Sequence, residues 1–291
     1  MSTTPQSLNP KPRLNVHYLA PGFSLTPPET VDELCRDKSN LIFCHGVTIV
    51  KLSPEVVVKI GAQVNFLEAK NMIYIGQNTE IPVPKVFACY TNGPINRDPD
   101  DYGGLYDTYI FMSFIDGNTL HTAWDTYDVA TKTRISTQLT GYIQEMRDLA
   151  SDGYIGSLDH GPVADHCLST SLNKGPFNSE GDFNEAILDT YQKSAPKRHI
   201  GSFLNGMLPG SHSILFTHGD LRPQNIMVRD GNVVAIIDWE LSGWYPEYWE
   251  FAKALLIWGW QSDWTDYVVR ILKPYHAEYF MHCFLMEKLL I

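Results

Sequence analysis

The stretch from Phe216 to Glu240 reads FTHGDLRPQNIMVRDGNVVAIIDWE, and it decides how the second half of the chain is expected to fold. Residues 225–228 and 233–237 are short apolar runs rich in β-branched residues, which favour strands. Asp230-Gly231-Asn232 between them is a hairpin turn signal. Because a hairpin returns on itself, the start of its first strand lies beside the end of its second. We therefore expect Asn225 to face Asp238.

Three polar side chains flank this predicted hairpin. Asp220 and Asn225 stand at D-x-x-x-x-N spacing, and Asp238 follows the second strand. Oxygen ligands from Asn225 and Asp238 suit Mg²⁺, which takes few protein ligands and completes its shell with water and nucleotide phosphates. Asp220 is then placed to accept a proton from a substrate hydroxyl. This combination of groups is the one that phosphoryl transfer uses.

The sequence before residue 117 favours strands, and the sequence after it favours helices. Runs 41–44, 48–52 and 56–60 read as short strands, and 64–75 has the spacing of an amphipathic helix with Gly76 as a stop signal. A further buried strand is predicted at 109–115. Helices are expected from 118 onward, most strongly over 129–149, with the hairpin inserted among them. This order predicts an α+β chain with two lobes rather than alternating βαβ units.

Composition limits the classes of function. The chain has 291 residues, 44% of them apolar, which is enough to bury a substantial core. The net charge of −11 argues against nucleic-acid or anionic-membrane binding through bulk electrostatics and suits a cationic small substrate. Five cysteines, never spaced as C-x-x-C, indicate reduced thiols. With no apolar stretch long enough to span a membrane and no secretion signal, we expect a cytoplasmic protein.

A family resemblance rests on the two motifs around the hairpin. His218-Gly219-Asp220-Leu221-Arg222-Pro223-Gln224-Asn225 resembles the H-G-D-x-x-x-x-N signature of the aminoglycoside phosphotransferase and choline kinase superfamily. Asp238-Trp239-Glu240 is similar to that family's D-x-E version of the kinase D-F-G element. The sequence of residues 243–250 resembles that of a branch of the superfamily that is common in filamentous fungi. The resemblance covers about residues 40 to 290, and it implies the protein-kinase-like fold.

The resemblance also implies nucleotide-binding residues in the first half. Val56-Val57-Val58-Lys59 resembles the V-A-I-K strand, whose lysine contacts the α and β phosphates, and Glu68 resembles the helix glutamate that pairs with that lysine. The interval from Lys59 to Glu68 is shorter than in protein kinases, so a solvated lysine and a surface glutamate remain alternatives. By the same match, the Ser113 carbonyl and the Ile115 amide would meet the adenine edge. Met112 would then limit the pocket behind them.

The resemblance implies a division of the chain and a reaction. Residues 1–28 are rich in Pro, Ser and Thr, which predicts an N-terminal arm that lies on the surface or is partly disordered. The resemblance divides the rest into an N-lobe 29–112, a hinge 113–116 and a helical C-lobe 117–291. The implied reaction moves the γ-phosphoryl group of ATP, with Mg²⁺, to a hydroxyl of a small molecule that is cationic or polyhydroxylated. Asp220 would orient or deprotonate the acceptor, and Arg222 occupies the place of a kinase lysine that faces the γ-phosphate. His218 is expected to pack and hold the loop.

Several alternatives stay open at the level of sequence. The segment from Asp238 to Pro246 is too short for a protein-kinase activation loop, which counts against a protein substrate. The absence of a G-x-G-x-x-G loop leaves a catalytically silent nucleotide-binding scaffold as a second reading. Glu240 could assist a second metal ion or a cationic substrate, or could only charge a helix start. A group of tryptophans could form a cation-binding cage or simply belong to the core: Trp239, Trp244, Trp249, Trp258, Trp260 and Trp264. A group of carboxylates could add negative charge to the same cleft or form a solvated surface: Glu247, Glu250, Asp263 and Asp266.

Overall fold

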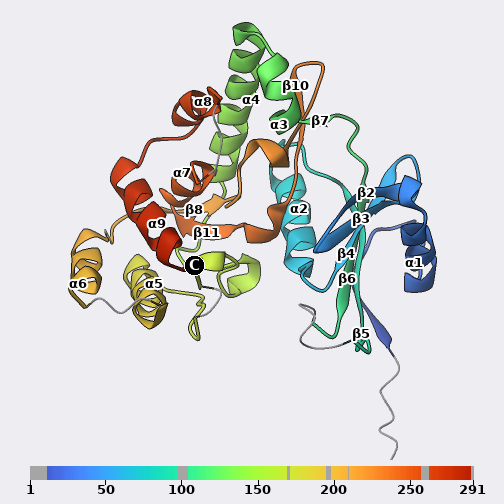
Figure 1. Cartoon of the computed structure of the whole chain (residues 1–291), viewed down its shortest axis with the longest axis horizontal. Coiled ribbons are helices and arrows are strands. Elements are labelled where there is room, and N and C mark those ends of the chain that lie inside the picture. Colours follow the sequence, from blue (N-terminus) through green and yellow to red (C-terminus); the bar gives the residue numbers. More distant parts are fainter. Residues whose placement is uncertain are drawn as a thin grey trace, which may run out of the picture. The chain divides into compact units, whose positions relative to one another are not determined.

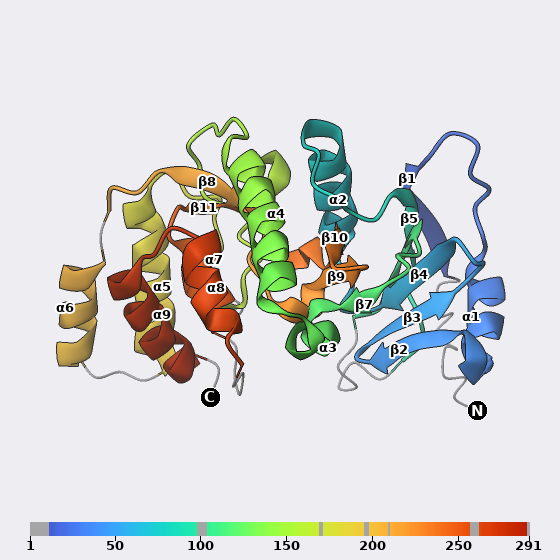
Figure 2. The ribbon, with the colours of Figure 1, turned by 90° about the horizontal axis from the view of Figure 1, so that it is seen from above.

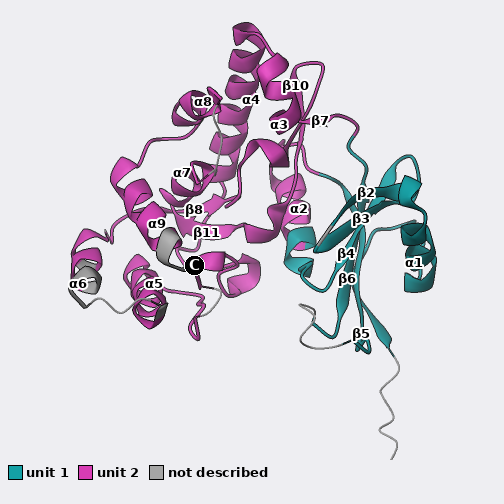
Figure 3. Cartoon of the chain, viewed as in Figure 1, with its two compact units in different colours: residues 1–69, 84–115 teal, residues 70–83, 116–291 magenta. Residues whose placement is uncertain are grey.

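The computed structural model describes residues 12–97, 104–168, 171–194, 198–208, 210–256 and 262–289. The chain divides into two compact units, residues 1–69 with 84–115 and residues 70–83 with 116–291 (Figure 3). The first unit is built on an antiparallel sheet, and the second is mainly helical (Figure 1). The predicted α+β class is therefore confirmed.

The first unit contains a six-stranded antiparallel sheet in the order β1-β5-β6-β4-β3-β2. Its elements are β1 (Arg13–Leu19), α1 (Pro28–Arg36), η1 (Lys38–Asn40), β2 (Leu41–His45), β3 (Val47–Lys51), β4 (Val56–Gly61), the start of α2 (Phe66–Asn78), β5 (Val86–Gly93) and β6 (Asp107–Ser113). Helix α2 runs through Gly76, so the predicted stop at that glycine is wrong, and residues 70–78 of the helix belong to the second unit. Figure 2 shows α1 against this sheet.

The two faces of this sheet have different roles. Val58 in β4 and Phe111 in β6 are paired, fully buried and part of a core that includes Val31 of α1. Because neighbouring residues of a strand point to opposite faces, Lys59 and Met112 lie on the other face. Met112 pairs with Val57, two residues from Lys59, so the two predicted nucleotide-binding side chains share one face. The alternation of β4 and β6 thus separates the core from the functional residues.

The N-terminal arm predicted for residues 1–28 is wrong over part of its length. Arg13–Leu19 forms β1, which pairs with β5 at the edge of the sheet, and α1 begins at Pro28. The side chains of β1 are almost all exposed. Backbone hydrogen bonds therefore hold this strand, and hydrophobic patterning gave no signal for it. Residues 1–11 lie outside the described ranges.

The second unit surrounds two small sheets with helices. The sheets have the strand orders β10-β9-β7 and β11-β8. After α2, the elements in chain order are β7 (Asn118–Thr119), α3 (Leu120–Ala123), η2 (Trp124–Thr126), α4 (Val129–Arg147), η3 (Leu158–His160), η4 (His166–Leu168), α5 (Glu180–Ser194), α6 (Arg198–Met207), β8 (Ile214–Thr217), η5 (Pro223–Asn225), β9 (Ile226–Arg229), β10 (Asn232–Ile236), η6 (Trp239–Leu241), β11 (Gly243–Pro246), α7 (Trp249–Ala254), α8 (Trp264–Ile271) and α9 (His276–Leu289).

The predicted hairpin is present as β9 and β10. Asp230 and Gly231 have φ values of 52° and 69°, the left-handed pair that a two-residue turn between right-twisted strands requires. The predicted long helix is α4, whose buried side chains Ile135, Leu139, Ile143 and Met146 share one face. Helix α9 packs against α5 and α7 (Figure 2). Among the described residues, no helix combines the length and apolar character needed to cross a membrane.

Candidate active site

The loop between β8 and β9 carries the H-G-D sequence in a tight conformation. Gly219 has a φ of 82°, and a Cβ added there would lie 2.8 Å from the Leu241 carbonyl oxygen. Both the backbone angle and the close approach exclude a larger side chain. Glycine at this position therefore lets the loop pass beside η6, which follows Asp238.

His218 holds this loop from inside the protein. Its Nδ1 accepts a hydrogen bond from the Asp220 backbone N–H at 3.1 Å, so its Nε2 carries the proton and donates to the Ile237 carbonyl at 3.1 Å. Burial lowers the pKa of His218 to about 4, which keeps the imidazole neutral at pH 7. The predicted packing and loop-holding role of His218 is confirmed.

The Asp220 carboxylate lies between an amide and a guanidinium. Its Oδ2 accepts a hydrogen bond from Asn225 Nδ2 at 2.7 Å and lies 3.0 Å from Arg222 Nε. Asn225 Nδ2 also donates to the Asp220 backbone oxygen at 2.9 Å. Burial raises the pKa of Asp220 to about 6 against the Arg222 charge, which lowers it. The structure thus brings together the predicted residues Asp220, Asn225 and Arg222.

The residues predicted to hold Mg²⁺ lie at the open end of the hairpin. Ile237, the neighbour of Asp238, donates its N–H to the Asn225 carbonyl at 2.9 Å, so the ends of the two strands are joined as expected. The Asp238 charge contributes to raising the pKa of Asp220, which places the two carboxylates in one electrostatic environment. With Nδ2 of Asn225 engaged by Asp220, its Oδ1 is the oxygen that a cation would use. An amide oxygen and a half-buried carboxylate are hard donors, a set that fits Mg²⁺.

Lys59 and Glu68 form the predicted ion pair within the first unit. Lys59 Nζ lies 2.7 Å from Glu68 Oε2, and both side chains are buried. The surface alternatives for these two residues are therefore wrong. The two residues can meet over this short interval of sequence because α2 begins at Phe66, soon after β4 ends at Gly61.

The segment predicted to meet adenine is held by backbone bonds. Ser113 N–H donates to the Lys85 carbonyl at 2.9 Å, and Ser113 Oγ accepts from Lys85 N–H at 3.0 Å. Phe114 N–H donates to the Glu55 carbonyl at 2.8 Å. Ile115 is half-buried, and Met112 is buried at the end of β6. These bonds fix the backbone on either side of the Ser113 carbonyl.

Glu250 is a site residue whose position the sequence analysis missed. It was considered as part of an acidic cleft or a solvated face, but it is only 1% exposed, at the start of α7. Its carboxylate accepts the backbone N–H groups of His218 at 2.6 Å and Gly219 at 3.3 Å. Burial raises its pKa to about 7, although both hydrogen bonds act to lower it. A single acid within the apolar run Trp249-Glu250-Phe251-Ala252 was the signal for this buried role.

The cation-binding cleft considered for the tryptophans is not formed by those that the structure describes. Trp239, Trp244, Trp249 and Trp264 are each at most 4% exposed and belong to the core. Trp258 and Trp260 lie outside the described residues.

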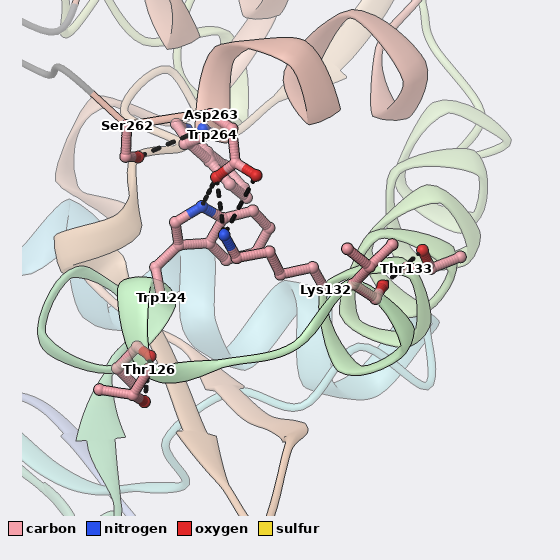
Figure 4. Close-up of polar contacts among 9 residues, drawn as sticks. Trp124, Thr126, Lys132, Thr133, Ser262, Asp263 and Trp264 are labelled. Carbon is pink, nitrogen blue, oxygen red and sulfur yellow. Dashed lines mark hydrogen bonds and ion pairs between the residues drawn. The ribbon is translucent and has the colours of Figure 1, made fainter.

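The carboxylate Asp263 is occupied by neighbouring side chains. It accepts the Trp124 indole N–H at 2.7 Å and pairs with Lys132 at 2.8 Å, beside the buried Trp264 (Figure 4). Glu247 lies 3.4 Å from Lys273. Glu247, Glu250 and Asp263, three of the four acids considered for the cleft, thus have partners within the second unit.

Comparison with known proteins identifies the family of this chain. A family model described as the phosphotransferase enzyme family (APH) matches residues 49–282. The chain therefore belongs to that family, and the predicted superfamily is confirmed. None of the curated proteins matches the sequence.

Solved structures of aminoglycoside phosphotransferases share the fold. APH(2″)-Ib in its ADP-bound form is 11% identical to this chain, with a TM-score of 0.57. The match covers 89% of this chain and 86% of the APH(2″)-Ib chain. The aminoglycoside-3′-phosphotransferase of type VIII is 13% identical, with 88% and 98% covered and a TM-score of 0.55. APH(3″)-Id from Streptomyces rimosus is 14% identical, with 89% and 97% covered and a TM-score of 0.53. At these identities the likeness concerns the fold, and it confirms the predicted protein-kinase-like class.

Proposed function

We propose that this protein is an ATP- and Mg²⁺-dependent phosphotransferase that moves the γ-phosphoryl group to a hydroxyl of a small molecule. The observation that carries the proposal is the 2.7 Å contact between Asp220 and Asn225 in the loop between β8 and β9. A half-buried carboxylate beside an amide whose oxygen is left to bind a cation is the arrangement that phosphoryl transfer needs. Structures of family relatives in complex with ATP or ADP support the choice of nucleotide.

In the proposed reaction, Asp220 accepts the proton of the acceptor hydroxyl. The acceptor oxygen bonds to the γ-phosphorus as the bond from that phosphorus to the bridging oxygen of ADP breaks. Lys59, oriented by Glu68, holds the α and β phosphates, and Arg222 neutralises charge at the γ-phosphate. Mg²⁺, when bound by Asn225 and Asp238, would supply further neutralisation of the phosphate oxygens.

The net charge of −11 suits a cationic acceptor, and the second unit also has a cavity lined by exposed acidic side chains. The cavity has a volume of about 420 Å³ and is lined by Asp182, Glu185 and Asp189 of α5 together with Asn173 and Asn178. Three carboxylates on successive turns of one helix favour ammonium groups. We therefore place cationic, polyhydroxylated compounds first among the acceptors to be tested.

The alternatives find less support. The segment after Asp238 passes directly through η6 and β11 to Pro246, which leaves no length for an activation loop that would order a protein substrate. A silent nucleotide-binding scaffold is disfavoured because the Lys59–Glu68 pair and the Asp220–Asn225 contact are both present.

A binding and turnover assay tests the proposed function. ATP is expected to raise the melting temperature more with Mg²⁺ than without it, because the metal shields the phosphates beside Asp238. A screen of cationic and polyhydroxylated metabolites is expected to find acceptor-dependent ADP release. Metal-dependent binding without ADP release on any acceptor would favour the scaffold instead.

The pH dependence of catalysis follows from the state of Asp220. Its pKa is raised to about 6, and only the ionised form accepts a proton, so kcat/KM is expected to rise through about pH 6 and then level off. Arg222 lowers this pKa, so Arg222→Gln is expected to move the rise to higher pH. Initial rates from about pH 5 to about pH 8 measure both profiles. A rise at the same pH in both proteins would contradict this assignment.

A further inference from the structure

Helix α2 carries two buried polar side chains on neighbouring positions. Glu68, 1% exposed, pairs with Lys59, and Asn71 is fully buried. Residues three apart lie next to one another on a helix, so these two side chains share a face. Asn71 Nδ2 donates to the Trp239 carbonyl at 2.7 Å and lies 3.4 Å from the Ser242 carbonyl. Because only an N–H group can donate to two carbonyl oxygens, these contacts also fix the orientation of the amide.

The Trp239 carbonyl belongs to the turn that contains the proposed metal ligand. Asp238 has φ 67° and ψ 59°, a left-handed conformation that costs free energy in a residue other than glycine. Such a conformation persists only where surrounding contacts hold it. Within the turn, Trp239 Nε1 donates to the Ile236 carbonyl at 2.8 Å. Asn71 adds a bond from a different element, α2.

Stability alone gives a poor account of Asn71. Its Oδ1 is buried without a hydrogen-bond partner among the described residues. A buried polar atom in this state costs free energy, and an apolar side chain would avoid that cost. The neighbouring α2 residues Met72 and Ile75 are buried and apolar, so the surroundings would accept such a side chain. The donor group of Asn71, rather than its packing, is therefore its distinguishing property.

We propose that Asn71 is a positioning residue that ties the Asp238-Trp239-Glu240 turn to helix α2, so that Mg²⁺-dependent nucleotide binding depends on this bond. The inference rests on the proposed function. Asn71 lies in the part of α2 that belongs to the second unit, as the turn does. Loss of the Asn71 donor leaves Asp238 in a turn with one restraint fewer.

Asn71→Leu tests the inference because it removes the donor at similar volume. In the ligand-free variant, backbone amide exchange over residues 238–242 is expected to be about tenfold faster than in the wild type, since one buried hydrogen bond is lost. Calorimetric titration with a non-hydrolysable ATP analogue is expected to show about a tenfold smaller enhancement of affinity by Mg²⁺. Affinity without Mg²⁺ is expected to stay unchanged. Asn71→Ala provides the same measurements if the leucine variant does not fold.

Asn78→Leu is the matched control on the same helix. Asn78 Nδ2 also donates at 2.7 Å, to the Tyr74 carbonyl, but Asn78 is exposed and far along α2 from the turn. This variant is expected to keep the wild-type exchange and the wild-type Mg²⁺ enhancement. A folded Asn71 variant with both properties unchanged would overturn the inference. If Mg²⁺ does not change the nucleotide affinity of the wild-type protein, the proposed function and the metal-binding part of this inference are overturned. The rate of backbone amide exchange over residues 238–242 still decides whether Asn71 holds the turn.

Discussion

Asp220→Asn is expected to lower turnover by about 10²–10⁴-fold, the contribution that a positioned general base makes. Asparagine keeps the shape of the side chain and an oxygen that can accept from Asn225 Nδ2, but it cannot take the proton of the acceptor hydroxyl. In the proposed mechanism other groups, above all Lys59, hold the nucleotide. We therefore expect nearly unchanged ATP affinity, so that kcat falls and the calorimetric Kd does not. Acceptor-dependent ADP release measures the loss.

Asp230→Asn is the control for this substitution. This variant makes the same chemical change in the same stretch of sequence, but at an exposed turn position, where φ is 52°. Asparagine tolerates the left-handed region as well as aspartate does, so turnover is expected to stay at the wild-type level. Wild-type turnover in a folded Asp220→Asn protein would remove Asp220 from the mechanism.

The site was predictable from sequence where its geometry is local. Asp220, Asn225 and Asp238 lie within one short stretch, and the Asp230-Gly231 turn forces the two strands to return on themselves. The loop and the strand end are then brought together by the hairpin, which the turn signal and the two short apolar runs predict. The Lys59–Glu68 pair is local in the same sense, because one strand and the following helix carry it.

The rest depends on contacts between distant parts of the chain. Glu250 reaches the backbone of His218 from α7, and although its apolar neighbours indicated burial, they did not indicate its partner. Asn71 reaches Trp239 from α2, with nothing in the local pattern to set it apart from other helix residues. Strand β1 is held by backbone pairing, which the pattern of polar and apolar side chains does not reveal. In each case a backbone group is the partner, and backbone groups carry no sequence signal.

Lys253→Met is expected to lower the free energy of unfolding by about 3–5 kcal/mol, the cost of leaving a buried charge without its partner. Lys253 Nζ lies 2.9 Å from Asp165 Oδ2, and the Asp165 side chain is fully buried. Burial acts to raise the pKa of Asp165, but Lys253 and the Cys167 backbone N–H hold it below its ordinary value. Without Lys253, burial dominates and the folded-state pKa rises above the unfolded one. The variant's deficit relative to wild type should therefore be largest at neutral pH and shrink on acidification, which urea unfolding at several pH values measures.

Lys253→Met combined with Asp165→Asn separates lost charge pairing from lost packing. Neither position 165 nor position 253 carries a charge in the double variant. The asparagine oxygen can still accept from Cys167 N–H, which lies 2.9 Å from Asp165 Oδ1 in the wild type. Part of the lost stability is therefore expected to return, and the rest is lost because Trp249 Nε1, 3.2 Å from Asp165 Oδ2, then faces the asparagine NH2 group. Lys273→Met, which breaks the exposed pair with Glu247, is the control and is expected to change stability little. Equal losses in the single and double variants would mean that the aliphatic part of Lys253, rather than its charge, stabilises the junction between η4 and α7.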